Sequence, residues 1–380
     1  MENRKLTICF LGTAASIHTV KWAEFFAEKG HNVHLVSYDD YKNKKSEKIF
    51  LHIIGKKIPF QLWHINTIIN LPRALFQTKK IFKKIKPDII NAHYVTSYGH
   101  LAVLSGFKPL VVTAWGSDIL VAPKESLIAK QAVKCVLKKA DLITCDADHM
   151  KKAIIKLGAS ENKIEIINFG IDVNRFLPGE KDLELSHKLG VSGSKIIISL
   201  RTFEPGYNLE TLLRAMVLVL RKYPTVKLIM VGGGSQEGFL KNLVSRLKID
   251  DSVKFVGLVL NDDLPRYLRL ADIYVSTSLS DGGIASSTAE AMACGLPVVI
   301  TNTGDNREWV KDGENGFLIP VKNPEILAEK IIYLLENEDV CKELGHNGRE
   351  TIMKRNNYYK EMAKMEEAYY RLVQKYNLYD

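Results

Sequence analysis

The chain has 380 residues, of which 46% are hydrophobic and 25% charged, a composition that fits a globular protein of two or three domains. Its five cysteines are widely spaced and form no C-x-x-C pair, which predicts a reducing, cytoplasmic compartment and argues against a disulfide framework or a structural zinc site. No apolar run approaches the roughly 20 residues of a membrane span, and the apolar stretch at residues 6–11 is too short for a secretory signal.

The positive charge is concentrated in the first half of the chain. Residues 1–180 contain 27 Lys and Arg against 16 Asp and Glu, whereas residues 181–380 contain 26 against 27. A basic half predicts an anionic partner, although a solvated lysine surface is an open alternative. Nucleic acid is disfavoured as that partner, because no recognition module accompanies the charge.

Two lysine-rich amphipathic helices are predicted in this basic half, at about residues 71–86 and 124–139. A loop carrying Phe60 and Trp63 among several lysines precedes the first of them. Together these segments favour peripheral attachment to an anionic membrane surface on its cytoplasmic face.

The first half alternates strands and helices. Strands are predicted at residues 6–11, 33–37, 87–93, 110–113 and 142–145, with further helices at 17–29, 71–86 and 124–139. The turn after the first strand begins at Gly12, but it lacks G-x-G-x-x-G, so dinucleotide binding is not supported.

The pattern restarts after an exit strand and linker at residues 165–179. Strands are predicted at 195–200, 226–231, 253–256, 273–276 and 298–300, and helices at 209–223, 236–247, 262–270 and about 356–379. We therefore expect two tandem α/β doubly wound, Rossmann-like domains, residues 1–172 and 173–359, with a C-terminal helix at about 360–380 packing back on the first. Ligands of such sheets lie at the carboxyl ends of the strands, and we expect them in a central cleft between the domains.

A glycine-rich loop followed by a short helix, residues 280–299, is the most informative stretch. Ser287 and Glu290 have the spacing of a capping box, and Gly295 followed by Pro297 predicts the end of the helix. The free N–H groups of such a helix suit a phosphate, and the Glu290 carboxylate could hold the hydroxyl pair of a sugar. The alternative is that both residues only cap the helix.

These residues carry a resemblance to a known family. The run Glu290-Ala291-Met292-Ala293-Cys294-Gly295-Leu296-Pro297-Val298-Val299, together with Trp115-Gly116-Ser117-Asp118 and the linker Asn168-Phe169-Gly170-Ile171-Asp172, resembles the retaining family 4 glycosyltransferases of the GT-B fold. The resemblance covers nearly the whole chain. It implies a donor-binding C-terminal domain and an acceptor-side N-terminal domain.

The resemblance assigns roles to several residues of the second domain. It implies that Glu290 holds the ribose hydroxyls of a nucleoside diphosphate sugar, and that the amides of Gly283, Ile284 and Ala285 face the diphosphate or the transferred hexose. Arg201 matches an arginine that neutralises the leaving diphosphate, a role that suits a bidentate guanidinium. A surface arginine at a strand end is the alternative for Arg201.

Further matches are expected around the cleft. Val259 matches an apolar residue that packs on the base, and Gly12 matches the turn beneath the diphosphate. His93 matches a histidine near the reacting sugar carbon, although a structural histidine at a strand end is an alternative. Trp115 and Asp118 are candidates for contact with the acceptor, and for Asp118 a helix-capping role is favoured.

The sequence departs from the family pattern at two positions. The family usually has a lysine five residues after the arginine, where this chain has Gly206, so that Tyr207 or Asn208 could supply only a neutral hydrogen bond. An acidic residue usually lies eight positions before the glutamate, where this chain has Gly282, and Asp281 could take over that catalytic role through a one-residue shift.

The expected activity is retaining transfer of a hexose from a UDP- or GDP-sugar to a saccharide, lipid-linked or glycolipid acceptor in cell-surface polysaccharide or glycoconjugate synthesis. A non-catalytic nucleotide-sugar-binding protein with a decayed site and a nucleotide-sugar epimerase are the alternatives. Neither a metal nor another cofactor is predicted. The D-x-D at Asp146 and Asp148 is rejected as a metal motif because such pairs are common by chance.

Overall fold

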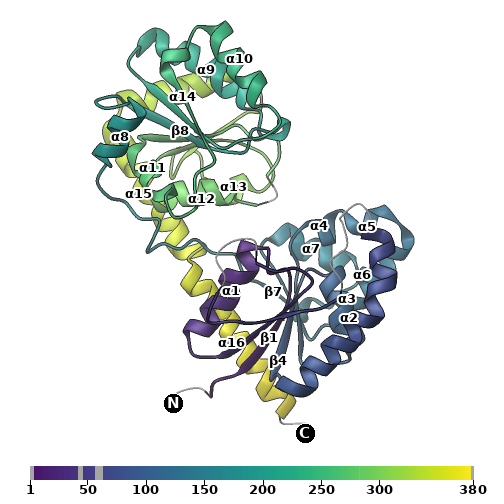
Figure 1. The fold of residues 1–380 in the computed structure, drawn as a ribbon. Coiled ribbons are helices and arrows are strands. Elements are labelled where there is room, and N and C mark those ends of the chain that lie inside the picture. Colours follow the sequence, from purple (N-terminus) through teal and green to yellow (C-terminus); the bar gives the residue numbers. More distant parts are fainter. Residues whose placement is uncertain (1–3, 42–45, 56–62, 282, 378–380) are drawn as a thin grey trace. The chain divides into compact units, whose positions relative to one another are not determined.

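The computed structural model describes residues 4–41, 46–55, 63–281 and 283–377, and divides the chain into two compact units (Figure 1). One unit comprises Met1–Phe169 with Tyr359–Asp380, and the other comprises Gly170–Tyr358. Each is built around its own parallel sheet, which confirms the prediction of tandem Rossmann-like α/β domains. The predicted Phe60 loop, the Trp63 side chain and position 282 lie outside the described residues.

The sheet of the first unit has seven described strands in the order β3-β2-β1-β4-β5-β6-β7, and all neighbours pair in parallel. The strands are β1 Thr7–Leu11, β2 Asn32–Ser37, β3 Phe50–Ile53, β4 Ile89–His93, β5 Leu110–Thr113, β6 Leu142–Cys145 and β7 Ile164–Ile166. The strand order reverses between β1 and β4, so this is the switch point at which such sheets bind ligands.

Helices cover both faces of this sheet. They are α1 Ile17–Glu28, α2 Trp63–Ile85, α3 Ser97–Ser105, α4 Ser117–Leu120, α5 Ala122–Glu125, α6 Leu127–Lys139, α7 Asp148–Lys156, the 3-10 turn η2 Glu161–Lys163 and α16 Tyr358–Asn377. Helices α2, α3 and α6 pack side by side, with α1 and α16 on the opposite face (Figure 1). None of the described helices has the length and apolarity that a membrane crossing requires.

The two lysine-rich helices differ from their predicted bounds. Helix α2 begins earlier than predicted and continues through Pro72. The helix expected at 124–139 is interrupted at Ser126, whose backbone is extended and whose hydroxyl accepts the Ala129 N–H at 3.0 Å. Ser126 therefore caps α6 and separates it from the short α5.

The C-terminal helix α16 packs on the first unit through a few buried contacts. The Tyr369 ring is fully buried against Phe26, and its hydroxyl accepts a hydrogen bond from Asn91 Nδ2 at 2.7 Å. His31 Nε2 lies 2.9 Å from Glu366 Oε1. Residues from the far end of the chain thus complete the core of the first unit.

The chain passes between the two units twice. The two passes lie side by side as an isolated β-bridge between Ile171 and Asn357. The Ile171 N–H donates to the Asn356 carbonyl, and the Ile171 carbonyl accepts the Tyr358 N–H. Gly170 has φ +75°, and a Cβ there would lie 2.3 Å from the Tyr358 Cα, so the crossing requires glycine.

The sheet of the second unit has six described strands in the order β10-β9-β8-β11-β12-β13, again all parallel. The strands are β8 Ile196–Leu200, β9 Lys227–Val231, β10 Val253–Gly257, β11 Ile273–Ser276, β12 Val298–Thr301 and β13 Phe317–Ile319. Its switch point lies between β8 and β11.

Two apolar cores lie on the two faces of this sheet, one under α9, α10 and α14 and one under α8, α11 and α12. The elements are α8 Leu183–Leu189, η3 Pro205–Tyr207, α9 Leu209–Lys222, α10 Glu237–Leu247, η4 Asp250–Ser252, α11 Leu264–Leu270, α12 Ser286–Ala293, α13 Asn306–Trp309, α14 Pro324–Glu336 and α15 Glu338–Arg355. Gly345 of α15 lies so close to α12 that a Cβ there would be 2.0 Å from the Gly295 carbonyl oxygen.

Candidate active site

Four of the predicted site residues lie at the two switch points. Gly12 directly follows β1 and His93 ends β4, the two strands between which the first sheet reverses. Arg201 directly follows β8, and Asp281 lies in the loop that follows β11, the corresponding pair in the second sheet. The fold alone therefore brings residues from distant parts of the sequence to the edges where ligands bind.

Arg201 is the best-defined residue at the second switch point. Its Nη2 lies 2.6 Å from Asp281 Oδ1, and the two side chains are only 7% and 8% exposed. The Tyr207 ring lies against the guanidinium, with 4.3 Å between Arg201 Cζ and the ring centroid. Nη1 lies 3.5 Å from Ser287 Oγ, so it faces the first turn of α12. The alternative of a surface arginine is wrong, because Arg201 is buried.

The start of α12 differs from the predicted capping box. Helix α12 begins at Ser286, its N-cap is Ala285, and no side chain in the described part of the chain caps it. The Ser287 hydroxyl instead pairs with the Tyr274 hydroxyl at 2.9 Å, since a buried phenol requires a hydrogen-bond partner. The helix does end as predicted, with Gly295 at φ +77°. Among the described residues, no N-cap side chain therefore occupies the amides at the start of α12.

The remaining donor-side candidates surround this helix start. Gly283, Ile284 and Ala285 form the loop that leads into α12, and Glu290 lies half-buried one turn into the helix. Val259, after β10, is half-buried against one core of the second unit. Their contacts with a nucleotide or a sugar stay predictions.

Sequence reasoning missed one residue of this site, Asn306 at the start of α13. It is 1% exposed, and its Nδ2 donates to Asp281 Oδ2 at 3.3 Å and to the Thr301 carbonyl at 2.9 Å. Both carboxylate oxygens of Asp281 are thereby engaged, one by Arg201 and one by Asn306. No sequence signal links these residues, because only the register of β11 and β12 brings their loops together.

His93 lies at the first switch point inside an aromatic cluster. It is 2% exposed, with the rings of Phe10, Trp22 and Trp115 at centroid distances of 5.3–5.4 Å. Its Nδ1 lies 3.2 Å from Thr19 Oγ1, whereas Nε2 is buried without a partner among the described residues. Burial and nearby His18 lower the pKa of His93 to about 3, so the ring is neutral near pH 7.

This buried histidine predicts a pH dependence of stability. In the unfolded chain the imidazole takes up a proton below about pH 6.5, while folded His93 stays neutral until about pH 3. The free energy of unfolding should therefore fall as the pH drops from 6.5 toward 4, by about 1.4 kcal/mol per pH unit from a fully shifted group. Denaturant unfolding of wild type and His93→Phe at several pH values should show a shallower decline in the variant. A His93 NMR signal that titrates near pH 6.5 would contradict this.

Gly12 packs tightly beneath the same histidine. A Cβ at Gly12 would lie 2.9 Å from Thr19 Cγ2 and 3.2 Å from His93 Cβ, so a larger residue would displace the ring. The turn thus needs glycine for close packing, in addition to any role beneath a diphosphate.

Trp115 and Asp118 shape the loop that follows β5. Asp118 is 1% exposed, and its two oxygens accept the backbone N–H groups of Val95, Trp115 and Gly116 at 2.8–3.0 Å. Burial raises the pKa of this carboxyl, and the three donors oppose the rise. The helix-capping role that the sequence favours for Asp118 is therefore wrong: the N-cap of α4 is Gly116, without a side-chain cap, and Asp118 instead holds the loop before the helix. Trp115 is partly exposed and packs against Phe169, with 5.1 Å between centroids. Contact of either residue with an acceptor stays a prediction.

No group of three or more His, Cys, Asp or Glu side chains in the described part of the chain is arranged to hold a metal ion. In the D-x-D sequence, Asp148 is the first residue of α7 and Asp146 lies in the loop before it.

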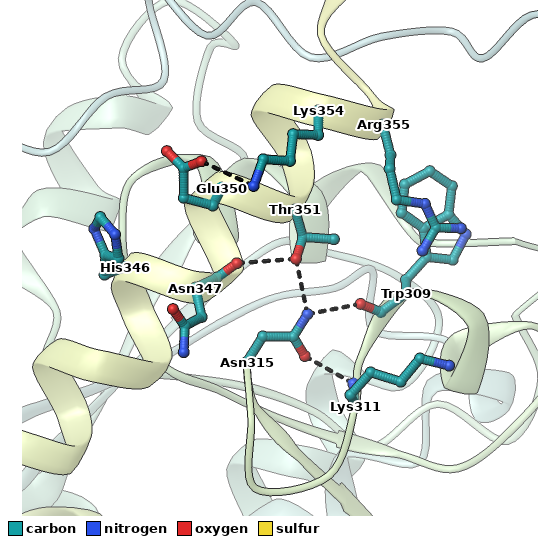
Figure 2. A pocket seen from close by; sticks show the side chains of 9 residues that line it. All are labelled: Trp309, Lys311, Asn315, His346, Asn347, Glu350, Thr351, Lys354 and Arg355. Carbon is teal, nitrogen blue, oxygen red and sulfur yellow. Dashed lines mark hydrogen bonds and ion pairs between the residues drawn. The ribbon is translucent and has the colours of Figure 1, made fainter.

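A pocket of about 500 Å³ opens elsewhere on the second unit, between α15 and the turn after α13 (Figure 2). Asn315 donates to Thr351 Oγ1 at 2.9 Å and to the Trp309 carbonyl at 3.0 Å, and it accepts the Lys311 N–H at 2.7 Å. Figure 2 shows these bonds tying the turn to α15. None of the predicted site residues lines this pocket, which surrounds a structural link.

Two family models match the chain, one in each unit. The model described as glycosyl transferases group 1 matches residues 182–351, and the glycosyl transferase 4-like model matches residues 7–147. An uncharacterized glycosyltransferase of Methanocaldococcus jannaschii is 26% identical over 320 residues, which cover 83% of this chain and 84% of that protein. The N-acetyl-alpha-D-glucosaminyl L-malate synthase of Bacillus anthracis is 24% identical over 355 residues, 90% of each chain.

Solved structures share the fold over nearly the whole length. Anabaena HepE, solved in complex with UDP, superposes with a TM-score of 0.80 at 20% identity, covering 97% of this chain and 100% of that one. A sucrose-phosphate synthase from Thermosynechococcus elongatus gives a TM-score of 0.78 at 19% identity, covering 98% and 100%. With the family models matching in both units and the fold shared throughout, the chain belongs to the family 4 glycosyltransferases of the GT-B fold and is a glycosyltransferase.

Proposed function

We propose that this glycosyltransferase moves a hexose from a UDP- or GDP-sugar to an acceptor hydroxyl with retention of the anomeric configuration. The observation that carries the proposal is the buried Arg201, whose Nη1 faces the first turn of α12. A fixed guanidinium beside uncapped helix amides is suited to the charge that develops on a leaving diphosphate. Crystal structures of Anabaena HepE with UDP and with UDP-glucose support a nucleotide-sugar donor.

Retention is supported by the state of Asp281. A double-displacement path needs a carboxylate free to attack the anomeric carbon. Asp281 has one oxygen on Arg201 and the other on Asn306. These bonds favour a same-face path, in which the acceptor approaches from the side that the diphosphate leaves and the departing phosphate oxygen receives the acceptor proton.

Glu290 provides the test of the donor site. Wild type should be thermally stabilised by UDP, GDP or ADP, since a ligand at 100 times its dissociation constant adds about 2.7 kcal/mol. If Glu290 holds the ribose hydroxyls, Glu290→Gln should weaken binding of the nucleoside diphosphate about tenfold. The same variant should weaken binding of the 2′-deoxy nucleoside diphosphate much less, because that ligand lacks one of the two hydroxyls. Calorimetric titration of both nucleotides measures this, with Glu329→Gln on the exposed face of α14 as the matched control.

Turnover then identifies the reaction. A panel of nucleotide sugars should give a glycosylated product only when an acceptor is present. Conversion of the sugar without an acceptor would indicate an epimerase, and binding without any turnover would contradict the proposed transfer.

We further propose that the acceptor is lipid-linked or a glycolipid, and that the face formed by α2, α3 and α6 docks on an anionic membrane from the cytoplasmic side. In these helices, residues 70–85, 97–105 and 127–139 carry nine Lys and Arg and no Asp or Glu. Apolar side chains are exposed on the same face, including Phe76 at 71%, Leu127 at 80% and Ile128 at 83%. Exposed apolar groups among lysines suit the interface of an anionic bilayer.

Vesicle sedimentation tests this docking face. The protein should sediment with vesicles containing phosphatidylglycerol but not with pure phosphatidylcholine, and high salt should release it, since each lysine near the surface contributes about 1 kcal/mol. The double variant Leu127→Ser/Ile128→Ser should bind more weakly, while Leu183→Ser, an equally exposed leucine on α8, should bind as wild type does. Equal binding to both vesicle types, or an equal loss in the control variant, would overturn the proposal.

A further inference from the structure

Arg201 is held on two sides, by Tyr207 from its own β8–α9 connection and by Asp281 from the loop after β11. Its guanidinium lies 4.3 Å from the Tyr207 ring centroid, and Nη2 is 2.6 Å from Asp281 Oδ1. Nη1 lies 3.5 Å from Ser287 Oγ. A guanidinium stacked on one ring and paired at one nitrogen has few orientations left, so the direction of Nη1 is fixed.

The residues that hold Arg201 are themselves fixed. Asn306 Nδ2 donates to Asp281 Oδ2 at 3.3 Å, and the Asp281 backbone is so close to Gly304 that a Cβ there would lie 1.6 Å from its carbonyl oxygen. Asn306 therefore holds the Asp281 carboxylate toward Arg201, and the Asp281 backbone is packed against the loop between β12 and α13.

The Tyr207 side of the clamp is anchored to the loop after β11. Thr277 Oγ1 donates to the Tyr207 carbonyl at 3.0 Å, and the Leu279 N–H donates to the Gly206 carbonyl at 2.8 Å. Gly206 thus contributes a backbone contact rather than a side-chain charge. Within the described residues, Arg201 is the cation that this cluster presents toward α12.

We propose that Tyr207, Asp281 and Asn306 are positioning residues that clamp Arg201 so that its Nη1 meets the diphosphate at the first turn of α12. The proposal rests on the proposed donor site and changes two expectations drawn from the sequence. Tyr207 acts through its ring rather than through a hydrogen bond from its hydroxyl, and Asp281 acts through Arg201 rather than on the sugar. Asn306 acts in turn through Asp281.

The test separates diphosphate binding from nucleoside binding. UDP, GDP and ADP are titrated calorimetrically against wild type, and the tightest of them is then compared with its nucleoside, which lacks the diphosphate. Tyr207→Leu is expected to weaken diphosphate binding about tenfold and to leave nucleoside binding within about twofold, since a desolvated cation–π contact is lost. Tyr207→Phe keeps the ring and should restore most of the diphosphate affinity. Asn337→Ala, which removes one bond to the Tyr333 carbonyl in the same unit, is the control variant.

Variants of Asp281 and Asn306 test whether Asn306 affects Arg201 through the Asp281 carboxylate. Asp281→Asn and Asn306→Ala should each weaken diphosphate binding, and the double variant should be no weaker than Asp281→Asn alone, because Asn306 works through that carboxylate. Thermal unfolding of each variant confirms that it is folded. The clamp is overturned if the two effects add, if nucleoside binding falls equally, or if Tyr207→Phe loses as much as Tyr207→Leu. Wild type that binds none of the three diphosphates would instead overturn the donor site itself.

Discussion

Arg201→Ala is expected to abolish most transfer activity and, at the same time, to lower the stability of the second unit. Loss of a preorganised cation at a developing charge should reduce kcat about 100- to 1,000-fold. The same change strands the Asp281 carboxylate, which is 8% exposed, without its ion-pair partner. Breaking a buried pair on one side costs about 3–5 kcal/mol, so denaturant unfolding should show a large loss.

A double variant separates these two effects. Arg201→Ala/Asp281→Ala removes both charges, so part of the lost stability should return while transfer stays low. Transfer assays alongside denaturant unfolding of the single and double variants give the comparison. Recovery of transfer together with stability would mean that Arg201 has only a structural role.

Gly304→Ala is expected to have the second large effect, although position 304 carries no functional group. Its φ is +51°, and a Cβ would lie 1.6 Å from the Asp281 carbonyl oxygen, so the two loops must separate. We expect a loss of about 3 kcal/mol or more in the free energy of unfolding, together with loss of nucleoside diphosphate binding, because Asp281 moves with its backbone.

Gly313 supplies the matched control for this prediction. It also has a positive φ, +77°, but a Cβ there meets nothing within 4 Å. Gly313→Ala should therefore cost only about 1–2 kcal/mol from the backbone conformation and should leave nucleotide binding intact. If both alanine variants behaved alike in unfolding and calorimetry, the close approach at Gly304 would not be what shapes the site.

Much of the architecture was predictable because buried parallel strands have a simple signature. The strands at 110–113, 142–145 and 273–276 were predicted with the bounds that the structure has, since each is a short apolar run between turn residues. The last strand, β13, and the helices α14 and α15 that follow it were not predicted. Helix α15 has few apolar residues in its long sequence, which leaves its periodicity weak.

Helix boundaries failed where a side chain had a competing partner. The spacing of Ser287 and Glu290 predicts a capping box, but the buried Tyr274 hydroxyl takes the serine hydroxyl instead. The break at Ser126 in the helix predicted at 124–139 was not predicted, because the lysine-rich amphipathic pattern continues across it. Local sequence rules predict a helix end correctly only when the capping side chain has no stronger hydrogen-bond partner elsewhere in the fold.

The family resemblance names individual candidate residues of the site, but it does not predict how they contact one another. Arg201 and Asp281 were each named from the sequence, yet as independent contacts to a donor. That they form one buried ion pair, held by Asn306, depends on three loops meeting at one edge of a sheet. A single sequence contains no signal that predicts such contacts between residues far apart in the chain.

Because the chain crosses between the units twice, the last helix of the first unit is synthesised only after the whole second unit. Translation at about 5–20 residues per second needs roughly 10–40 s to pass from Phe169 to Tyr359, during which the whole second unit emerges. Throughout that interval Phe26 and Asn91 lack the Tyr369 side chain that contacts both of them in the folded protein. We therefore expect the nascent first unit to expose this part of its core, and the second unit to be able to fold before α16 completes the first.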